Sequence, residues 1–101
     1  MFGRKKEEAK LTGKAKIIHD IQSITDGQTL RYKLGSQYFG GNAVAVVGLN
    51  PGHGEKKGDE GRKYQITIDV NGKVDPFGYF DNVNQMADFL IGRKGELITS
   101  N

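Results

Sequence analysis

The sequence predicts one α+β domain, an antiparallel β-meander of four to five strands with one C-terminal α-helix packed on one face. Several runs alternate apolar and polar residues with a period of two, which is typical of half-buried strands. The dipeptide Asn71-Gly72 joins two such runs, and this pair is the strongest short-range signal for a hairpin. Residues 81–91 alone show a clear helical period, and they follow the last expected strand.

The first strand is expected over residues 14–24. One face of that strand would carry alternate residues that are mostly apolar, namely Ala15, Ile17, His19, Ile21 and Ser23. Residues 25–28 form a tight turn that contains Gly27, and residues 29–34 then alternate cleanly. We therefore expect these two strands to pair as a hairpin.

The central strand is expected over residues 42–49, which are apolar on both faces, as in strands that are covered on both sides. Residues 50–63 form a long connection rich in glycine and charge. Residues 64–70 and 73–80 form the second hairpin, and Pro76 with Gly78 would mark a bulge or a sheet edge in its second strand.

The expected helix begins at an N-cap, Asp81 or Asn82, and ends at Gly92. Its apolar face has the spacing of an amphipathic helix and consists of Val83, Met86, Ala87, Leu90 and Ile91. Leu97 and Ile98 would pack back on the sheet or fray.

Composition and charge limit the class of protein. The 101 residues suit one domain, expected over residues 13–98, with residues 99–101 disordered. The net charge of +3 is uneven, because residues 1–16 carry six bases and two acids while the rest carry nine bases and ten acids. We expect residues 1–12 to be a mobile basic tail. With no cysteine, no apolar run long enough for a membrane span and no secretory signal, a small soluble cytoplasmic protein without membrane association is expected.

The aromatic pair Tyr38-Phe39 is a candidate binding feature, because Gly40 and Gly41 flank it. The alternative, which we favour, is that both rings pack over the end of the sheet.

The connection over residues 50–63 offers a candidate site for an anion, formed by His53, Lys56, Lys57 and Arg62. No P-loop pattern can be aligned there, and the acids of the segment would repel phosphate. A simple exposed hairpin connection is the stronger interpretation. A metal site at His53 would need further ligands on rigid elements, so no metal or cofactor is expected.

No arrangement of nucleophile, base and acid is recognisable, so we expect a protein that is not an enzyme. The preferred function is a non-catalytic module that binds a protein partner or a second copy of itself, because the central strand needs cover on two faces. One alternative is anion binding by the 50–63 connection. The other is weak, salt-sensitive nucleic-acid binding by a basic arm, which comprises Arg4, Lys5, Lys6, Lys10, Lys14 and Lys16.

Overall fold

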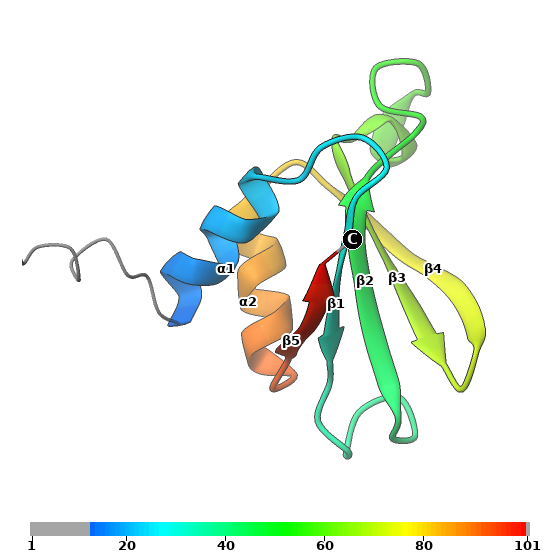
Figure 1. The fold of residues 1–101 in the computed structure, drawn as a ribbon. Coiled ribbons are helices and arrows are strands. Elements are labelled where there is room, and N and C mark those ends of the chain that lie inside the picture. The colour runs from blue at the N-terminus through cyan, green and yellow to red at the C-terminus, as the bar shows by residue number, and fades with distance from the viewer. Residues whose placement is uncertain (1–12, 101) are drawn as a thin grey trace, which may run out of the picture.

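The computed structural model describes residues 13–100 and shows a five-stranded antiparallel sheet with two helices on one face (Figure 1). The elements in chain order are α1 (Gly13–Gln22), β1 (Thr29–Lys33), β2 (Ala43–Leu49), the short 3-10 helix η2 (Gly58–Gly61), β3 (Tyr64–Val70), β4 (Lys73–Phe80), α2 (Val83–Gly92) and β5 (Glu96–Ser100). The α+β class and the antiparallel sheet agree with the sequence-based expectation.

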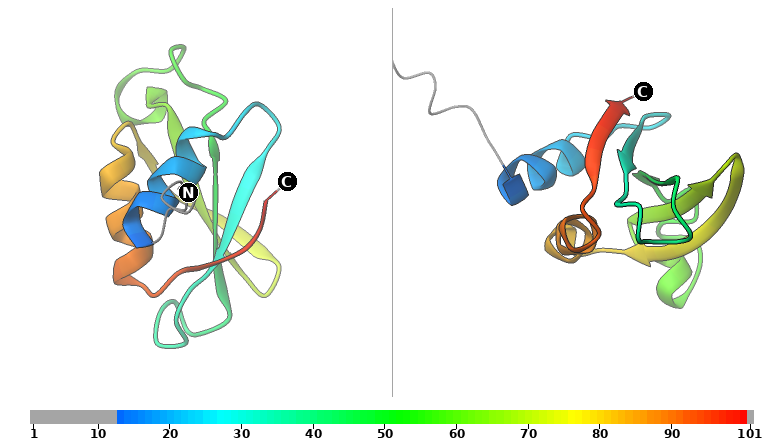
Figure 2. Two further views of the ribbon diagram at one scale, coloured as in Figure 1. Left: turned by 60° about the vertical axis from the view of Figure 1, so that its left-hand side comes forward. Right: turned by 90° about the horizontal axis from the view of Figure 1, so that it is seen from below.

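Strands β1 to β4 form the expected meander, and the sheet order is β4-β3-β2-β1-β5. The turn between β3 and β4 is formed by Asn71 and Gly72, whose φ angles are 55° and 91°. Both values are positive, as a tight hairpin turn requires, so this part of the prediction is confirmed. Helix α2 then carries the chain from the β4 edge to the opposite edge, where β5 pairs with β1 (Figure 2).

The expected strand over residues 14–24 is wrong, because most of this segment forms helix α1. Ile17 and Ile21 are four residues apart, which suits a helical face as well as an alternating strand, whereas Ile24, three residues further on, fits only the helical face. The position beside β1 that such a strand would take is occupied by β5. The predicted turn at residues 25–28 therefore joins a helix to a strand.

The hydrophobic core lies between the sheet and the two helices, which pack side by side on one face (Figures 1 and 2). Alternate residues of β1, β2 and β3 point into it, as the period of two predicts. The largest fully buried side chains are those of Tyr32, Ile21, Leu34, Ile66, Met86, Leu90 and Val47.

Within residues 13–100, no helix covers the opposite face of β2, and the cover expected on that face consists of side chains of the sheet itself. Val44 and Val46 are partly buried on that face. Arg31 of β1 reaches across β2 to Asp69 of β3, with 2.9 Å between Nη2 and Oδ2. Because a long arginine side chain covers apolar surface with its aliphatic stem, this ion pair shields the two valines from water.

Helix α2 begins as predicted, because the side chain of Asn82 accepts a hydrogen bond from the backbone N–H of Gln85 at 3.2 Å. The helix ends at Gly92, also as predicted. Its apolar face differs from the expected one at two positions. Phe89 is 8% exposed and belongs to the core, whereas Ile91 is 46% exposed.

Both edge strands contain a β-bulge. In β4 the extra residue is Phe77, and in β5 it is Ile98. Bulges disturb the row of edge hydrogen-bonding groups and so disfavour pairing with another strand. Strand β5 also includes Thr99 and Ser100, which extends the folded part past the expected boundary at residue 98. Within residues 13–100, neither helix is long and apolar enough to cross a membrane.

Candidate interaction surface

The turn after β1 places Tyr38 and Phe39 at the C-terminal end of α2. The backbone N–H of Gly35 donates to the carbonyl oxygen of Arg93 at 2.8 Å, which ties this turn to the helix end. The hydroxyl of Tyr38 donates to the carbonyl oxygen of Gly92 at 3.0 Å. Carbonyl groups in the last turn of a helix lack a partner within the helix, so Tyr38 supplies one. Phe39, in contrast, is 40% exposed.

Phe39 lies in a strained stretch of backbone. The φ angles of Phe39, Gly40, Gly41 and Asn42 are 52°, 77°, 87° and 54°, all in the left-handed region. Glycine adopts such angles freely and asparagine tolerates them. A phenylalanine there costs about 1–2 kcal/mol because its Cβ approaches the following carbonyl oxygen. The fold therefore holds this exposed ring in place at an energetic cost.

Phe77 is directed by the bulge of β4. The register between β3 and β4 shifts between Ile66 and Thr67, which leaves Phe77 without a partner residue. Strict alternation from Tyr79 would place Phe77 on the face away from the helices. The bulge instead brings its ring to the helix side, where it contacts Phe89 of α2.

These residues form one patch, which we call the aromatic surface and define as Phe39, Phe77, Phe89 and Arg93. The ring centroids of Phe39 and Phe77 are 6.1 Å apart at an interplanar angle of 88°. Those of Phe77 and Phe89 are 4.6 Å apart at 40°. The Arg93 guanidinium carbon lies 4.2 Å from the Phe89 centroid. Phe39 and Phe77 are 40% and 43% exposed, so the outer two rings face solvent.

The aromatic surface can contribute apolar contact area and one cation. Within residues 13–100, Arg93 forms no ion pair, so its charge is not neutralised by a carboxylate of the fold. The exposed rings of Phe39 and Phe77 meet edge to face, so the two do not form one continuous flat platform for stacked bases. The arrangement is suited to binding an apolar side chain next to a carboxylate.

The 50–63 connection is a closed loop rather than an open one. The buried Asn50 side chain donates to the carbonyl oxygens of Glu60 and Arg62, both at 2.7 Å, and accepts from the Gly52 backbone N–H at 3.0 Å. A Cβ on Gly61 would lie 2.0 Å from the carbonyl oxygen of Lys56, so only glycine fits at position 61. The loop is therefore held together by its own hydrogen bonds.

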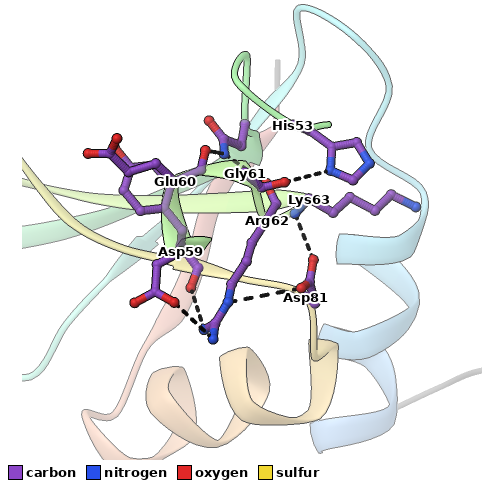
Figure 3. A network of polar contacts seen from close by, with 9 residues as sticks. His53, Asp59, Glu60, Gly61, Arg62, Lys63 and Asp81 are labelled. Atoms are coloured by element: carbon purple, nitrogen blue, oxygen red, sulfur yellow. Dashed lines mark hydrogen bonds and ion pairs between the residues drawn. The ribbon is translucent and has the colours of Figure 1, made fainter. Parts of the chain in front are cut away.

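Two of the four candidate anion ligands already contact other polar groups of the protein (Figure 3). Nδ1 of His53 lies 3.1 Å from the Gly61 carbonyl oxygen. Nη2 of Arg62 lies 3.0 Å from Asp59, and its Nε lies 4.0 Å from Asp81. Lys56 and Lys57 are exposed on the same loop. The structure thus brings these residues to one loop but does not converge their charges on a common point.

The basic arm is only partly described. Arg4, Lys5, Lys6 and Lys10, together with the whole expected tail at 1–12, lie outside the described residues, as does Asn101. Lys14 and Lys16 belong to α1, where Lys14 pairs with Asp88 at 2.9 Å and Lys16 with Asp20 at 2.6 Å. Both lysines are therefore linked to carboxylates of the fold.

The part of the chain from residue 13 to residue 100 contains no group of three or more potential metal ligands. His19, which was expected on the mostly apolar face of a strand, is instead an exposed residue of helix α1.

Sequence reasoning identified one member of the aromatic surface, Phe39, together with its neighbour Tyr38, but missed the other three members. Phe77 carried a signal, because Pro76 and Gly78 indicated a bulge beside it. Phe89 and Arg93 carried none, since their proximity to Phe77 depends on the path of α2 across the sheet.

Comparisons with known proteins add no further constraint. No protein-family model matches the chain, and no match was found among curated proteins or among solved structures.

Proposed function

We propose that this protein is a non-catalytic interaction module that binds a protein partner through the aromatic surface. The observation that carries the proposal is that the backbone positions both solvent-facing rings, one through a strained residue and the other through a β-bulge. Phe39 has a positive φ, and Phe77 is the extra residue of a β-bulge. Strain such as that at Phe39 is concentrated at functional sites, where the rest of the fold compensates for it, and β-bulges are over-represented next to such sites.

The nature of the rings supports the same proposal. Scattered exposed apolar residues are normal in folded proteins. Here two exposed phenylalanines contact one another and continue into the core through Phe89. Aromatic residues and arginine are enriched at protein interfaces and among the residues that contribute most to affinity.

The expected partner presents an apolar side chain next to an acidic one. The apolar group would lie against Phe39 and Phe77, and the acidic group would pair with Arg93. Because both sheet edges are bulged, we expect side-chain contacts and not strand addition to provide the affinity.

The test uses the variant Phe39→Asn. Asparagine tolerates the left-handed region, as Asn42 already does in this turn at φ 54°, so the variant keeps the backbone and removes the ring. Val74→Thr is the matched control, because Val74 is a 54% exposed apolar residue on the same strand as Phe77. A random peptide library displayed on phage would be selected on the wild-type protein and depleted on Phe39→Asn. Selected peptides would then be synthesised and followed by amide NMR.

The proposal expects peptides that combine an aromatic or large aliphatic residue with Asp or Glu. They should shift the amides of residues 38–41, 77–78 and 92–94 in the wild type and in Val74→Thr but not in Phe39→Asn. Self-association seen by sedimentation, and lost only in Phe39→Asn, would identify a second copy as the partner. Equal binding by Phe39→Asn, or no selection at all, would reject the proposal. Shifts of the same amides by a single-stranded oligonucleotide at moderate salt would favour nucleic acid instead.

A further inference from the structure

Two adjoining hollows lie between α1 and the side of the sheet formed by β1 and β5. One, of about 300 Å³, lies toward the C-terminal end of α1, and the other, of about 370 Å³, lies toward its N-terminal end. Both are lined by Lys16, Asp20 and Leu97, so they form one continuous depression, which we call the α1 groove. Its remaining walls include the apolar side chains of Ile17, Ile24 and Leu30.

Tyr32 of β1 forms part of the floor of the α1 groove. Its side chain is 2% exposed, and its hydroxyl is the one enclosed side-chain polar group of the described residues without a hydrogen-bond partner. Burial raises the pKa of Tyr32 to about 12, and the charge of Asp20 adds to this rise. Buried polar groups are paired in the great majority of folded proteins, so an enclosed hydroxyl without a protein partner indicates that something else pairs with it.

Asp20 lies on the helix side of the α1 groove. Its Oδ2 accepts a hydrogen bond from Nζ of Lys16 at 2.6 Å, while Oδ1 has no such bond to a described residue. The Asp20 carboxylate acts electrostatically on Tyr32 but is not hydrogen-bonded to it. A single polar group between the two could accept from the phenol and donate to the carboxylate.

We propose that the α1 groove binds a small uncharged molecule with a largely apolar body, through a hydroxyl group that bridges Tyr32 and Asp20. A hydroxyl both accepts and donates a hydrogen bond. A carboxylate would be repelled by Asp20, and an ammonium group has no lone pair to accept the phenol hydrogen. The apolar walls favour a hydrocarbon body by removing its surface from water.

Because the Tyr32 hydroxyl is enclosed, this binding mode requires α1 to move outward until the hydroxyl contacts the bound group. Ile21 is the one fully buried residue of that helix, so it is the side chain that would have to stay in the core during this movement.

The experiment uses the full chain and three probes that share one skeleton, 3-phenylpropan-1-ol, 3-phenylpropylamine and 3-phenylpropanoate. Each probe is titrated while the amide NMR spectrum is recorded. Tyr32→Phe removes only the phenol hydroxyl, and Asp20→Asn removes the charge but keeps a polar side chain. Tyr64→Phe is the matched control, because Tyr64 is similarly buried on the same face of the sheet, at 4% exposure.

The alcohol should bind most tightly and shift the amides of residues 16–20, 32 and 95–97. Tyr32→Phe should weaken its binding by about five-fold, the effect of one hydrogen bond, whereas Tyr64→Phe should bind as the wild type does. Asp20→Asn should improve the carboxylate relative to the alcohol. If no probe shifts these amides, or if the alcohol binds equally to Tyr32→Phe, the groove holds water only and the proposal is wrong.

Discussion

Replacing Tyr32 by phenylalanine should stabilise the free protein at neutral pH. The substitution keeps the buried ring and removes a hydroxyl that is enclosed and without a partner among the described residues. Leaving a buried donor unsatisfied costs about 1–3 kcal/mol, while the ring itself retains its packing. We therefore expect Tyr32→Phe to raise the free energy of unfolding by about 1 kcal/mol in the absence of ligand.

The stabilisation should increase at alkaline pH. Burial raises the pKa of Tyr32 from 10.0 to about 12 in the folded state, with a further contribution from Asp20. Folding thus favours the protonated phenol over the phenolate. The part of the free energy of unfolding that depends on this preference is fully present below pH 10 and is lost as the pH rises toward 12. From these two pKa values the wild type should lose about 1 kcal/mol at pH 11 through this group, and the phenylalanine variant should not.

The measurement is urea denaturation followed by far-ultraviolet circular dichroism at pH 7, 9 and 11. The difference between wild type and Tyr32→Phe isolates the phenol, because lysines and other tyrosines titrate in both proteins. Tyr64→Phe, on the core strand β3 two strands away in the sheet, controls for general loss of a tyrosine. A variant less stable than the wild type at pH 7 would contradict this prediction, since it would mean that the hydroxyl forms a favourable hydrogen bond in the free protein. A difference that does not grow between pH 9 and 11 would refute the enclosure of the phenol.

Further predictions concern the loop, the helix cap and the open face of the sheet. Gly61→Ala should lower the free energy of unfolding by about 3 kcal/mol, because the loop must open and lose the Asn50 hydrogen bonds. Gly54→Ala is the control, because a Cβ there meets no atom within 4 Å and should cost only about 1 kcal/mol of backbone strain. Similar urea midpoints for Gly61→Ala and Gly54→Ala would contradict the clash expected at residue 61. Asn82→Ala should cost about 1 kcal/mol through loss of the N-cap of α2, and unchanged amide exchange in the first turn of α2 would argue against this. A double-mutant cycle of Arg31→Met and Asp69→Asn should give a coupling of about 1 kcal/mol that decreases in salt, and zero coupling at low salt would show that the pair does not stabilise the sheet.

Most of the sheet could be predicted because its signals are local. Residues 64–70 and 73–80 form strands with the expected bounds, and the turn at Asn71-Gly72 requires positive φ angles that its residue types favour. The N-cap at Asn82 was also readable, because the cap bond spans only three residues. Each of these features depends on neighbours within a few positions of the chain.

The error at α1 shows where local reasoning stops. Ile17 and Ile21 are four residues apart, a spacing that places them on one face of a strand and on one face of a helix alike. The choice was decided by β5, which pairs with the free side of β1 and leaves no position for another strand there. That pairing joins segments more than sixty residues apart in the chain, and no short window contains it.

The candidate sites divide in the same way. The glycines after Phe39 and the proline before Phe77 are local signals that a ring could be exposed or a strand bulged, and both were visible in the sequence. The contact between Phe77 and Phe89 was not, because it requires the bulge and the packing of α2 together. Likewise, clean alternation predicted that Tyr32 faces the core but not that its hydroxyl would lie near Asp20 without a partner.

Periodicity and turn chemistry were sufficient to predict strands with one buried face, a tight hairpin and a capped C-terminal helix. The identity of α1, the position of β5, the aromatic surface and the α1 groove could be found only in the assembled fold. The physical reason is that each of these depends on contacts between distant segments, whose free energy is realised only when the whole core is assembled.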